Sequence, residues 1–241
     1  MTRISITILN RFFTLSLSAL LLISISLGFV SCRDTTFGEP GDKIGTSDCL
    51  IQTWYAAESF KEVSFAPALR IIELKFNVTE AEKETYQTKY DDHHYNETAN
   101  PGQYTALVNE FDGISITSDQ DFNGIPAGGE LGEKFWLIAE SPYKWLKSGS
   151  LVTYDWNNPL PSAPIDENMI RSYLQNKVPY FYPVVVNVSK LKKEDLLLLD
   201  NSCVALVAGE TPAIKEHKLT ITFHEGERVI KNAATVVFNE K

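Results

Sequence analysis

The 241-residue sequence lacks the short motifs by which several enzyme classes are recognised. It contains no G-x-S-x-G nucleophile elbow, no H-E-x-x-H zinc motif, no P-loop and no G-x-G-x-x-G dinucleotide motif. These absences count against an enzyme without excluding one, because catalytic residues that lie far apart in the sequence can still meet in a fold. The sequence also shows no internal repeat and no low-complexity tract.

Positive charge is scarce as well. The chain has 22 lysine and arginine residues against 31 aspartate and glutamate residues, which gives a formal net charge of −9. No stretch gathers enough basic residues to form a patch for nucleic acid or for an anionic membrane surface. We therefore expect an acidic surface that keeps the domain in solution, and no nucleic-acid partner.

The start of the sequence has the pattern of an export signal rather than of a folded segment. Arg3 and Arg11 supply the positive start, and no charged residue follows from Phe12 to Val30. This apolar run falls between a signal core of about 7–15 residues and a membrane-spanning helix of about 20, so an uncleaved anchor is an alternative. Interspersed serines and the pair Ser31-Cys32 favour cleavage before the cysteine.

The segment Phe29-Val30-Ser31-Cys32 resembles a lipobox. Phe29 stands where an aliphatic residue is usual, a departure that the loose lipoboxes of Bacteroidota tolerate. The resemblance implies that residues 1–31 are a signal peptide and that Cys32 becomes an acylated N-terminus, with palmitate or a similar chain. Two or more acyl chains anchor a protein stably, whereas one binds only marginally. We therefore predict a cell-envelope lipoprotein that is held to a membrane by its N-terminal lipid.

The residues after Cys32 bear on which side of the outer membrane the protein faces. Surface-exposed lipoproteins of Bacteroidota resemble one another in an acidic run at this place. Here the segment is Arg33-Asp34-Thr35-Thr36, with a single acidic residue. The comparison favours an outer-membrane lipoprotein that faces the periplasm and leaves surface exposure as an alternative.

The mature chain divides into a tether and one domain. Residues 32–48 are rich in Gly, Asp, Thr and Pro, as expected of a flexible tether, and residues 49–241 are predicted to form a single β-rich domain. Cys49 and Cys203 are the two cysteines left in an oxidising compartment, which predicts a disulfide between them. Two separate buried thiols are the alternative, because spacing in sequence does not show that the residues meet.

Short strands separated by turns dominate the predicted domain. Ile114 and Ile116 alternate with polar residues, as in a strand with one buried face, and the end of the chain predicts a hairpin that turns at Gly226. A further hairpin is predicted for 196–199 with 203–207. The one expected helix spans 167–177, because Asp166 is a suitable N-cap and apolar residues recur on one face. The predicted fold is a mainly β, antiparallel β-sandwich, Ig-like or similar.

Two blocks of the domain resemble a group of Bacteroidota lipoproteins built on a domain of unknown function. The first block is Ile114–Gly128, where an I-x-I-x-S-D strand runs into a loop and a P-A-G element. The second is the C-terminal hairpin, with Leu219-Thr220-Ile221-Thr222-Phe223 and Val236-Val237-Phe238. The resemblance implies a shared structural element but no activity, since none is assigned to these proteins.

The first block also matches a calcium-loop pattern, D-x-[DN]-x-[DN]-G-x5-E. The candidate ligands are Asp119, Asp121, Asn123 and Glu130, with Gly124 at the turn. Oxygen ligands at alternating positions surround a hard cation, and a bidentate glutamate closes the shell. A strand rather than a helix precedes the loop, so an ordinary polar turn between strands is the alternative, and no other cofactor is expected.

Aromatic residues gather between positions 136 and 156. Trp145, Tyr154 and Trp156 are interleaved with turn-forming residues, which is the arrangement in which β-sandwich modules stack sugar rings. The alternative is that these rings fill the core.

The function predicted from the sequence is a non-enzymatic binding or structural module that contacts a glycan, a peptide or an envelope protein. The alternative is a lipid-anchored hydrolase that acts on polysaccharide. A hydrolase would show a cleft with two facing carboxylates about 5–10 Å apart. A binding module would show a shallower surface with exposed rings, and a structural subunit a flat apolar patch.

Overall fold

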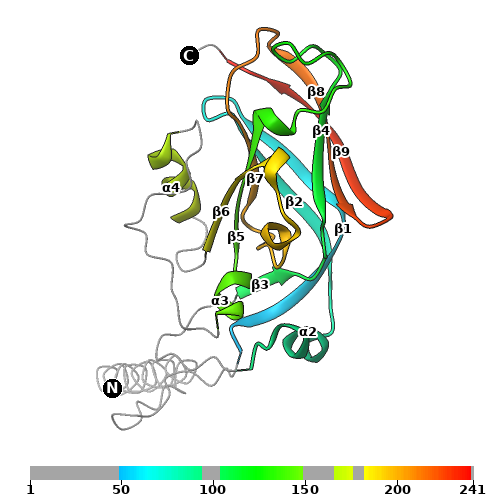
Figure 1. Cartoon of the computed structure of the whole chain (residues 1–241), viewed down its shortest axis with the longest axis vertical. Helices are drawn as coiled ribbons and strands as arrows, with labels where there is room; N and C mark the ends of the chain where they lie inside the picture. The colour runs from blue at the N-terminus through cyan, green and yellow to red at the C-terminus, as the bar shows by residue number, and fades with distance from the viewer. Residues whose placement is uncertain (1–48, 94–103, 149–165, 176–181, 240–241) are drawn as a thin grey trace, which may run out of the picture. The chain divides into compact units, whose positions relative to one another are not determined.

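A computed structural model describes residues 49–93, 104–148, 166–175 and 182–239, which are mainly β and form two sheets (Figure 1). The predicted signal peptide, Cys32 and the tether lie outside the described residues, as do Tyr154 and Trp156. Among the described residues, no helix is long and apolar enough to cross a membrane.

The larger sheet has six strands in the order β3-β1-β2-β7-β5-β6. These strands are β1 (Ile51–Ala66), β2 (Ile71–Glu80), β3 (Tyr104–Leu107), β5 (Phe135–Ser141), β6 (Tyr182–Asn187) and β7 (Val204–Ala208). Four of the neighbouring pairs are antiparallel, and β1 and β3 run parallel. The antiparallel prediction therefore holds for most of the sheet and fails at its β3 edge.

The smaller sheet has three antiparallel strands in the order β4-β8-β9. They are β4 (Gly113–Ser118), β8 (Glu216–Glu225) and β9 (Arg228–Val237). The C-terminal hairpin is confirmed, with Gly226 at a φ of 60°, where glycine meets no steric penalty. The alternation in β4 is also confirmed, since Ile114 and Ile116 are buried and Ser115 and Thr117 are more exposed.

Apolar side chains of both sheets share the largest hydrophobic cluster of the described residues. Its centre is a group of phenylalanine rings: Phe76 stacks on Phe60 at 4.9 Å between ring centroids and meets Phe223 edge-on at 5.3 Å. Phe111 meets Phe223 at 5.1 Å. Buried phenylalanines of this kind typically stabilise a domain by about 3–5 kcal/mol each relative to alanine.

The sequence predicted one helix, but the described residues contain three: α2 (Lys83–Tyr90), α3 (Tyr143–Lys147) and α4 (Glu167–Gln175). Helix α4 confirms the predicted helix and its cap, because the backbone N–H of Asn168 donates to Asp166 Oδ1 at 2.9 Å. Ile170 and Leu174 of α4 pack in a cluster with residues of β5, β6 and β7.

The hairpin predicted for 196–199 with 203–207 is wrong in its first half. β7 forms, but the chain before it makes a 3₁₀ turn at Lys193–Leu196, and Leu198 has a φ of 54°. Leucines 196–199 are all buried. A continuous apolar run does not distinguish a strand from an irregular segment that is covered on every side.

Candidate functional site

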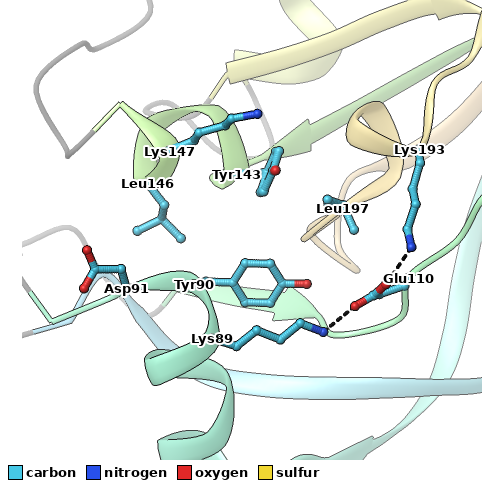
Figure 2. Close-up of a pocket in the computed structure, with 9 residues that line it drawn as sticks. All are labelled: Lys89, Tyr90, Asp91, Glu110, Tyr143, Leu146, Lys147, Lys193 and Leu197. Atoms are coloured by element: carbon cyan, nitrogen blue, oxygen red, sulfur yellow. Dashed lines mark hydrogen bonds and ion pairs between the residues drawn. The ribbon is translucent and has the colours of Figure 1, made fainter.

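A cavity of about 500 Å³ opens between the end of α2, the helix α3 and the segment that contains the 3₁₀ turn at Lys193–Leu196 (Figure 2). Its lining combines tyrosine rings, leucines, lysines and two acidic residues: Lys89, Tyr90, Asp91, Glu110, Tyr143, Leu146, Lys147, Lys193 and Leu197. We call it the tyrosine–lysine cavity. Its apolar and charged groups are the kinds from which small-molecule sites are built.

Two tyrosine rings form a corner in this cavity. Tyr90 and Tyr143 lie 6.3 Å apart between centroids with an interplanar angle of 89°, and Figure 2 shows Tyr143 above Tyr90. Behind them, Tyr90 stacks on the fully buried ring of Trp54 at 5.8 Å and 10°. This stacking joins α2 to the start of β1 and fixes the Tyr90 ring, while both tyrosines stay half-buried.

A glutamate between two lysines forms the other end of the cavity. Glu110 accepts a hydrogen bond from Lys193 Nζ at 2.6 Å and a second from Lys89 Nζ, as the dashed lines in Figure 2 show. The bonds from Lys193 and Lys89 lower the pKa of Glu110 to about 2, and the bond to Glu110 raises the pKa of Lys89. Glu110 and Lys89 therefore both stay charged at neutral pH.

The loop that carries Glu110 is held by hydrogen bonds on both sides. The buried Asn109 accepts from the backbone N–H of Ala57 at 2.6 Å and donates to Glu225 Oε2 at 3.0 Å. The backbone N–H of Glu110 donates to Glu225 Oε1 at 2.8 Å. The loop is thus fixed to β1 and to the end of β8, which places the glutamate before any ligand arrives.

A buried aspartate holds the end of α2, which supplies Lys89 and Tyr90. Asp92 is 1% exposed, and its two carboxylate oxygens accept from the backbone N–H groups of Leu50 at 2.8 Å and Ile51 at 2.9 Å. Burial raises the pKa of Asp92 to about 6, against the opposing effect of those two hydrogen bonds.

The remaining lysine of the cavity has a weaker partner. Lys147 Nζ lies 3.6 Å from a carboxylate oxygen of Glu194, and both side chains are about 60% exposed (59% and 62%). The same ammonium lies 5.6 Å from the centroid of the Tyr143 ring. Lys147 therefore places an exposed positive charge beside an aromatic ring at one wall of the cavity.

Of the predicted stacking residues, only Trp145 lies in the described part of the chain, and it does not line this cavity. Trp145 is 4% exposed and packs in a cluster with Leu50, Trp54 and Leu146. Its ring therefore fills the core, which was the alternative to ligand stacking. Tyr143, two positions earlier in the same aromatic stretch, lines the cavity instead. Sequence reasoning missed Tyr90 altogether, although the segment around it is rich in tyrosine and charge.

The four predicted calcium ligands lie on the loop that follows β4, and each already accepts hydrogen bonds. The oxygens of Asp119, Asp121 and Asn123 accept from the backbone N–H groups of Lys218, Gly124 and Ala213. Glu130 Oε1 accepts from Ile116 and Gly132. Among the described residues, no group of three or more His, Cys, Asp or Glu side chains is placed to hold a metal. Calcium binding at this loop stays a prediction.

Cys49 and Cys203 are both buried, and the structure contains no disulfide between them. Cys203 packs beside α4 with residues of β5 and β7, whereas Cys49 precedes β1, where Leu50 and Ile51 belong to a different cluster. The pairing of these two cysteines in an oxidising compartment stays a prediction.

A second cluster of acidic residues lies at the end of β5, outside the tyrosine–lysine cavity. Glu140 is fully buried, and neither of its carboxylate oxygens has a hydrogen-bond partner within the described part of the chain. Burial, and then the nearby Asp200, raise the pKa of Glu140 to about 9. Asp200 is itself buried, and burial raises its pKa although Ser202 donates to it.

Comparison of the chain with models of protein families, with curated protein sequences and with solved structures found no match. The resemblance of the Ile114–Gly128 block and the C-terminal hairpin to Bacteroidota lipoproteins therefore stays a prediction from the sequence. The function has to be argued from the chemistry of the sites themselves.

Proposed function

We propose that the protein is a lipid-anchored lipoprotein of the cell envelope that binds a saccharide in the tyrosine–lysine cavity and does not alter it chemically. The observation on which this rests is the corner of Tyr90 and Tyr143 beside the lysine–glutamate cluster in one open cavity. The lipobox-like segment that ends at Cys32 supports the lipid anchor. We expect the anchor to lie in the outer membrane, with the domain facing the periplasm.

Saccharides match this mixture of groups. A pyranose ring has apolar C–H faces that stack on aromatic rings, and its hydroxyl groups both donate and accept hydrogen bonds. Tyr90 and Tyr143 supply the rings, while Glu110 supplies an acceptor beside two lysine donors. Because Trp54 holds the Tyr90 ring, and Asn109 and Glu225 hold the loop of Glu110, these two groups need little ordering on binding.

The carboxylates argue against the alternative hydrolase. A glycosidase needs one carboxylic acid that stays protonated until it gives its proton to the leaving group. Glu110 has a pKa of about 2 and is ionised, so it is unsuited to that role. Glu140 has the raised pKa, but it is fully buried and does not line the tyrosine–lysine cavity.

We also infer that the two sheets form a β-sandwich. Both sheets contribute to one apolar cluster, and the phenylalanine contacts Phe60–Phe223 and Phe76–Phe223 join them directly. Binding residues often lie on the segments that connect the elements of a rigid scaffold, and the cavity is built from such connecting segments.

A glycan array tests the binding proposal. The full chain, extracted from membranes in detergent, is applied to neutral and acidic oligosaccharides beside the variants Tyr143→Leu and Tyr143→Phe. We expect the leucine variant to lose at least about tenfold in affinity and the phenylalanine variant to keep most of it, because the phenylalanine ring preserves stacking. Equal affinity of the leucine and phenylalanine variants would refute the proposal. Binding of no saccharide by the wild type would also refute it.

The anchor is tested separately by the intact mass of the membrane-extracted protein. We expect an N-terminus at Cys32 with the added mass of acyl chains. An unprocessed N-terminus would show that the anchor proposal is wrong and would leave the cavity argument unaffected.

A further inference from the structure

We propose that the bound saccharide is anionic, with a carboxylate or sulfate group, and that Lys147 selects it. This inference rests on the proposed saccharide binding and adds the chemical class of the ligand. The observations behind it are the charge of the cavity, the pairing of its lysines, and the position of Lys147 over Tyr143.

The charge of the cavity differs in sign from that of the protein. Three lysines and two acidic residues line it, which gives an excess of one positive charge in a chain with a net charge of −9. A positive site on an acidic protein is a local feature, because the rest of the surface repels anions. A ligand with negative charge therefore suits the lining once it replaces Glu194, which lies outside the lining and 3.6 Å from Lys147.

Two of the three lysines are already engaged. Lys89 and Lys193 both donate to Glu110, so two positive charges share one carboxylate and both ammonium groups are held beside it. Glu110 keeps its negative charge at neutral pH because those lysines hold its pKa at about 2. At this end of the cavity an acidic group would face the Glu110 carboxylate as well as the two ammonium groups, whereas a sugar hydroxyl can donate to Glu110 or accept from a lysine.

Lys147 is the lysine that an acidic group can recruit. Its partner Glu194 is 3.6 Å away, and exposed pairs of this kind contribute little to stability. A ligand carboxylate or sulfate can replace that partner at little cost. Figure 2 shows Lys147 extending above Tyr143, so the ammonium and the ring border the same space.

The position of the charge also gives selectivity. A sugar ring that stacks in the tyrosine corner brings its substituents within reach of Lys147, whose stem is flexible. A neutral saccharide gains the stacking alone. An acidic saccharide gains the stacking together with a charge-assisted hydrogen bond.

The helix α3 provides a matched control. Lys144 lies one turn before Lys147, is 52% exposed and faces Asp195 at 3.9 Å, but it does not line the cavity. Replacing either lysine by glutamine removes the same charge from the same helix. A general effect of net charge would appear in both variants, whereas a specific contact would appear only in Lys147→Gln.

The experiment measures affinity by calorimetry for hexuronic-acid oligosaccharides, for sulfated hexose oligosaccharides and for the matched neutral hexose oligosaccharides. The full chain in neutral detergent is compared with Lys147→Gln and Lys144→Gln at about 50 mM and about 500 mM salt. We expect at least one acidic series to bind about tenfold or more tightly than its neutral counterpart. This preference should fall several-fold in Lys147→Gln and at high salt, and stay unchanged in Lys144→Gln.

The outcomes separate this inference from the proposed function. Equal affinity for acidic and neutral saccharides that still depends on Tyr143 would overturn the inference and leave the saccharide site standing. Loss of the preference in both lysine variants would also overturn it, since net charge alone would then explain the effect. Equal binding of an acidic peptide, tested as polyglutamate, would show a nonspecific cation site and would overturn it as well.

Discussion

One glutamate lines the tyrosine–lysine cavity and another lies near the end of β5. The two differ in exposure, in hydrogen bonding and in the direction of their pKa shifts. Glu110, beside the cavity, is partly exposed, receives hydrogen bonds from two lysines and has a pKa of about 2. Glu140, on β5, is fully buried with no hydrogen-bond partner within the described residues, and its pKa is about 9. One stays charged and the other neutral at the same pH.

The surroundings of an acidic side chain, rather than its residue type, therefore decide what it can do. Water and two cations stabilise the carboxylate of Glu110, so the cavity can present fixed charges to a ligand. Burial without a cation favours the neutral form of Glu140, and the neighbouring Asp200 adds to the effect. The proposed binding site lies where solvent and cations stabilise charge.

The largest effect is expected at Glu140. Its carboxyl ionises near 4.5 in an ordinary environment and near 9 here, so between these values folding takes up a proton and stability falls as the pH rises. The slope is about 1.4 kcal/mol per pH unit for one proton. We expect Glu140→Leu to raise the free energy of unfolding at pH 8 by about 2–4 kcal/mol, and by much less at pH 5. Urea unfolding at the two pH values measures this.

Glu140→Gln is the control for packing, because it keeps the shape of the side chain but cannot ionise. It should remove most of the pH dependence between pH 5 and pH 8. If the wild type keeps constant stability across this range, the account of Glu140 is wrong.

Removal of a second buried acid, Asp92, should lower the free energy of unfolding, whereas removal of Glu140 should raise it. Because it accepts hydrogen bonds from Leu50 and Ile51, Asp92→Ala leaves two buried N–H groups without partners. We expect a loss of about 2–3 kcal/mol in the free energy of unfolding. The folded pKa of about 6 lies above the ordinary 3.8, so in the wild type this group's contribution declines as the pH rises from about 4 to 6. A stable Asp92→Ala protein would contradict this role.

The smallest effect on stability is expected at Glu110. Its ion pairs with Lys89 and Lys193 involve side chains that are 39%, 43% and 51% exposed, so Glu110→Gln should change the free energy of unfolding by less than about 1 kcal/mol. Saccharide affinity should nevertheless fall, because Lys89 and Lys193 lose the group that positions them. Calorimetric affinity and urea unfolding of the same variant check both parts; a large loss of stability with unchanged affinity would show that Glu110 serves the fold.

The elements that local patterns determine were predictable from the sequence. The alternation in β4, the turn at Gly226 and the cap of α4 at Asp166 each depend on neighbouring residues. The parallel pairing of β1 with β3 was not, because it depends on contacts between distant segments. Leucines 196–199 were misassigned for a similar reason, since burial on all sides suits strands and irregular segments alike.

The candidate site was largely invisible in the sequence. Lys89, Glu110 and Lys193 are far apart in the chain and meet only in the fold. Trp145 and Tyr143 are two positions apart in one aromatic stretch, yet the first is in the core and the second lines the cavity. Composition alone does not show which ring faces outward, because the helix that carries both is only five residues long.

The most direct test of the account is hydroxyl-radical footprinting of the full chain with and without the saccharides that the glycan array selects. Mass spectrometry then reports the oxidation of each tyrosine. We predict protection of Tyr90 and Tyr143, with no change at Tyr55, which lines a separate cavity. Protection at Tyr55 with Tyr90 and Tyr143 unchanged, or no saccharide to test because none binds, would contradict the proposal that the tyrosine–lysine cavity is the binding site.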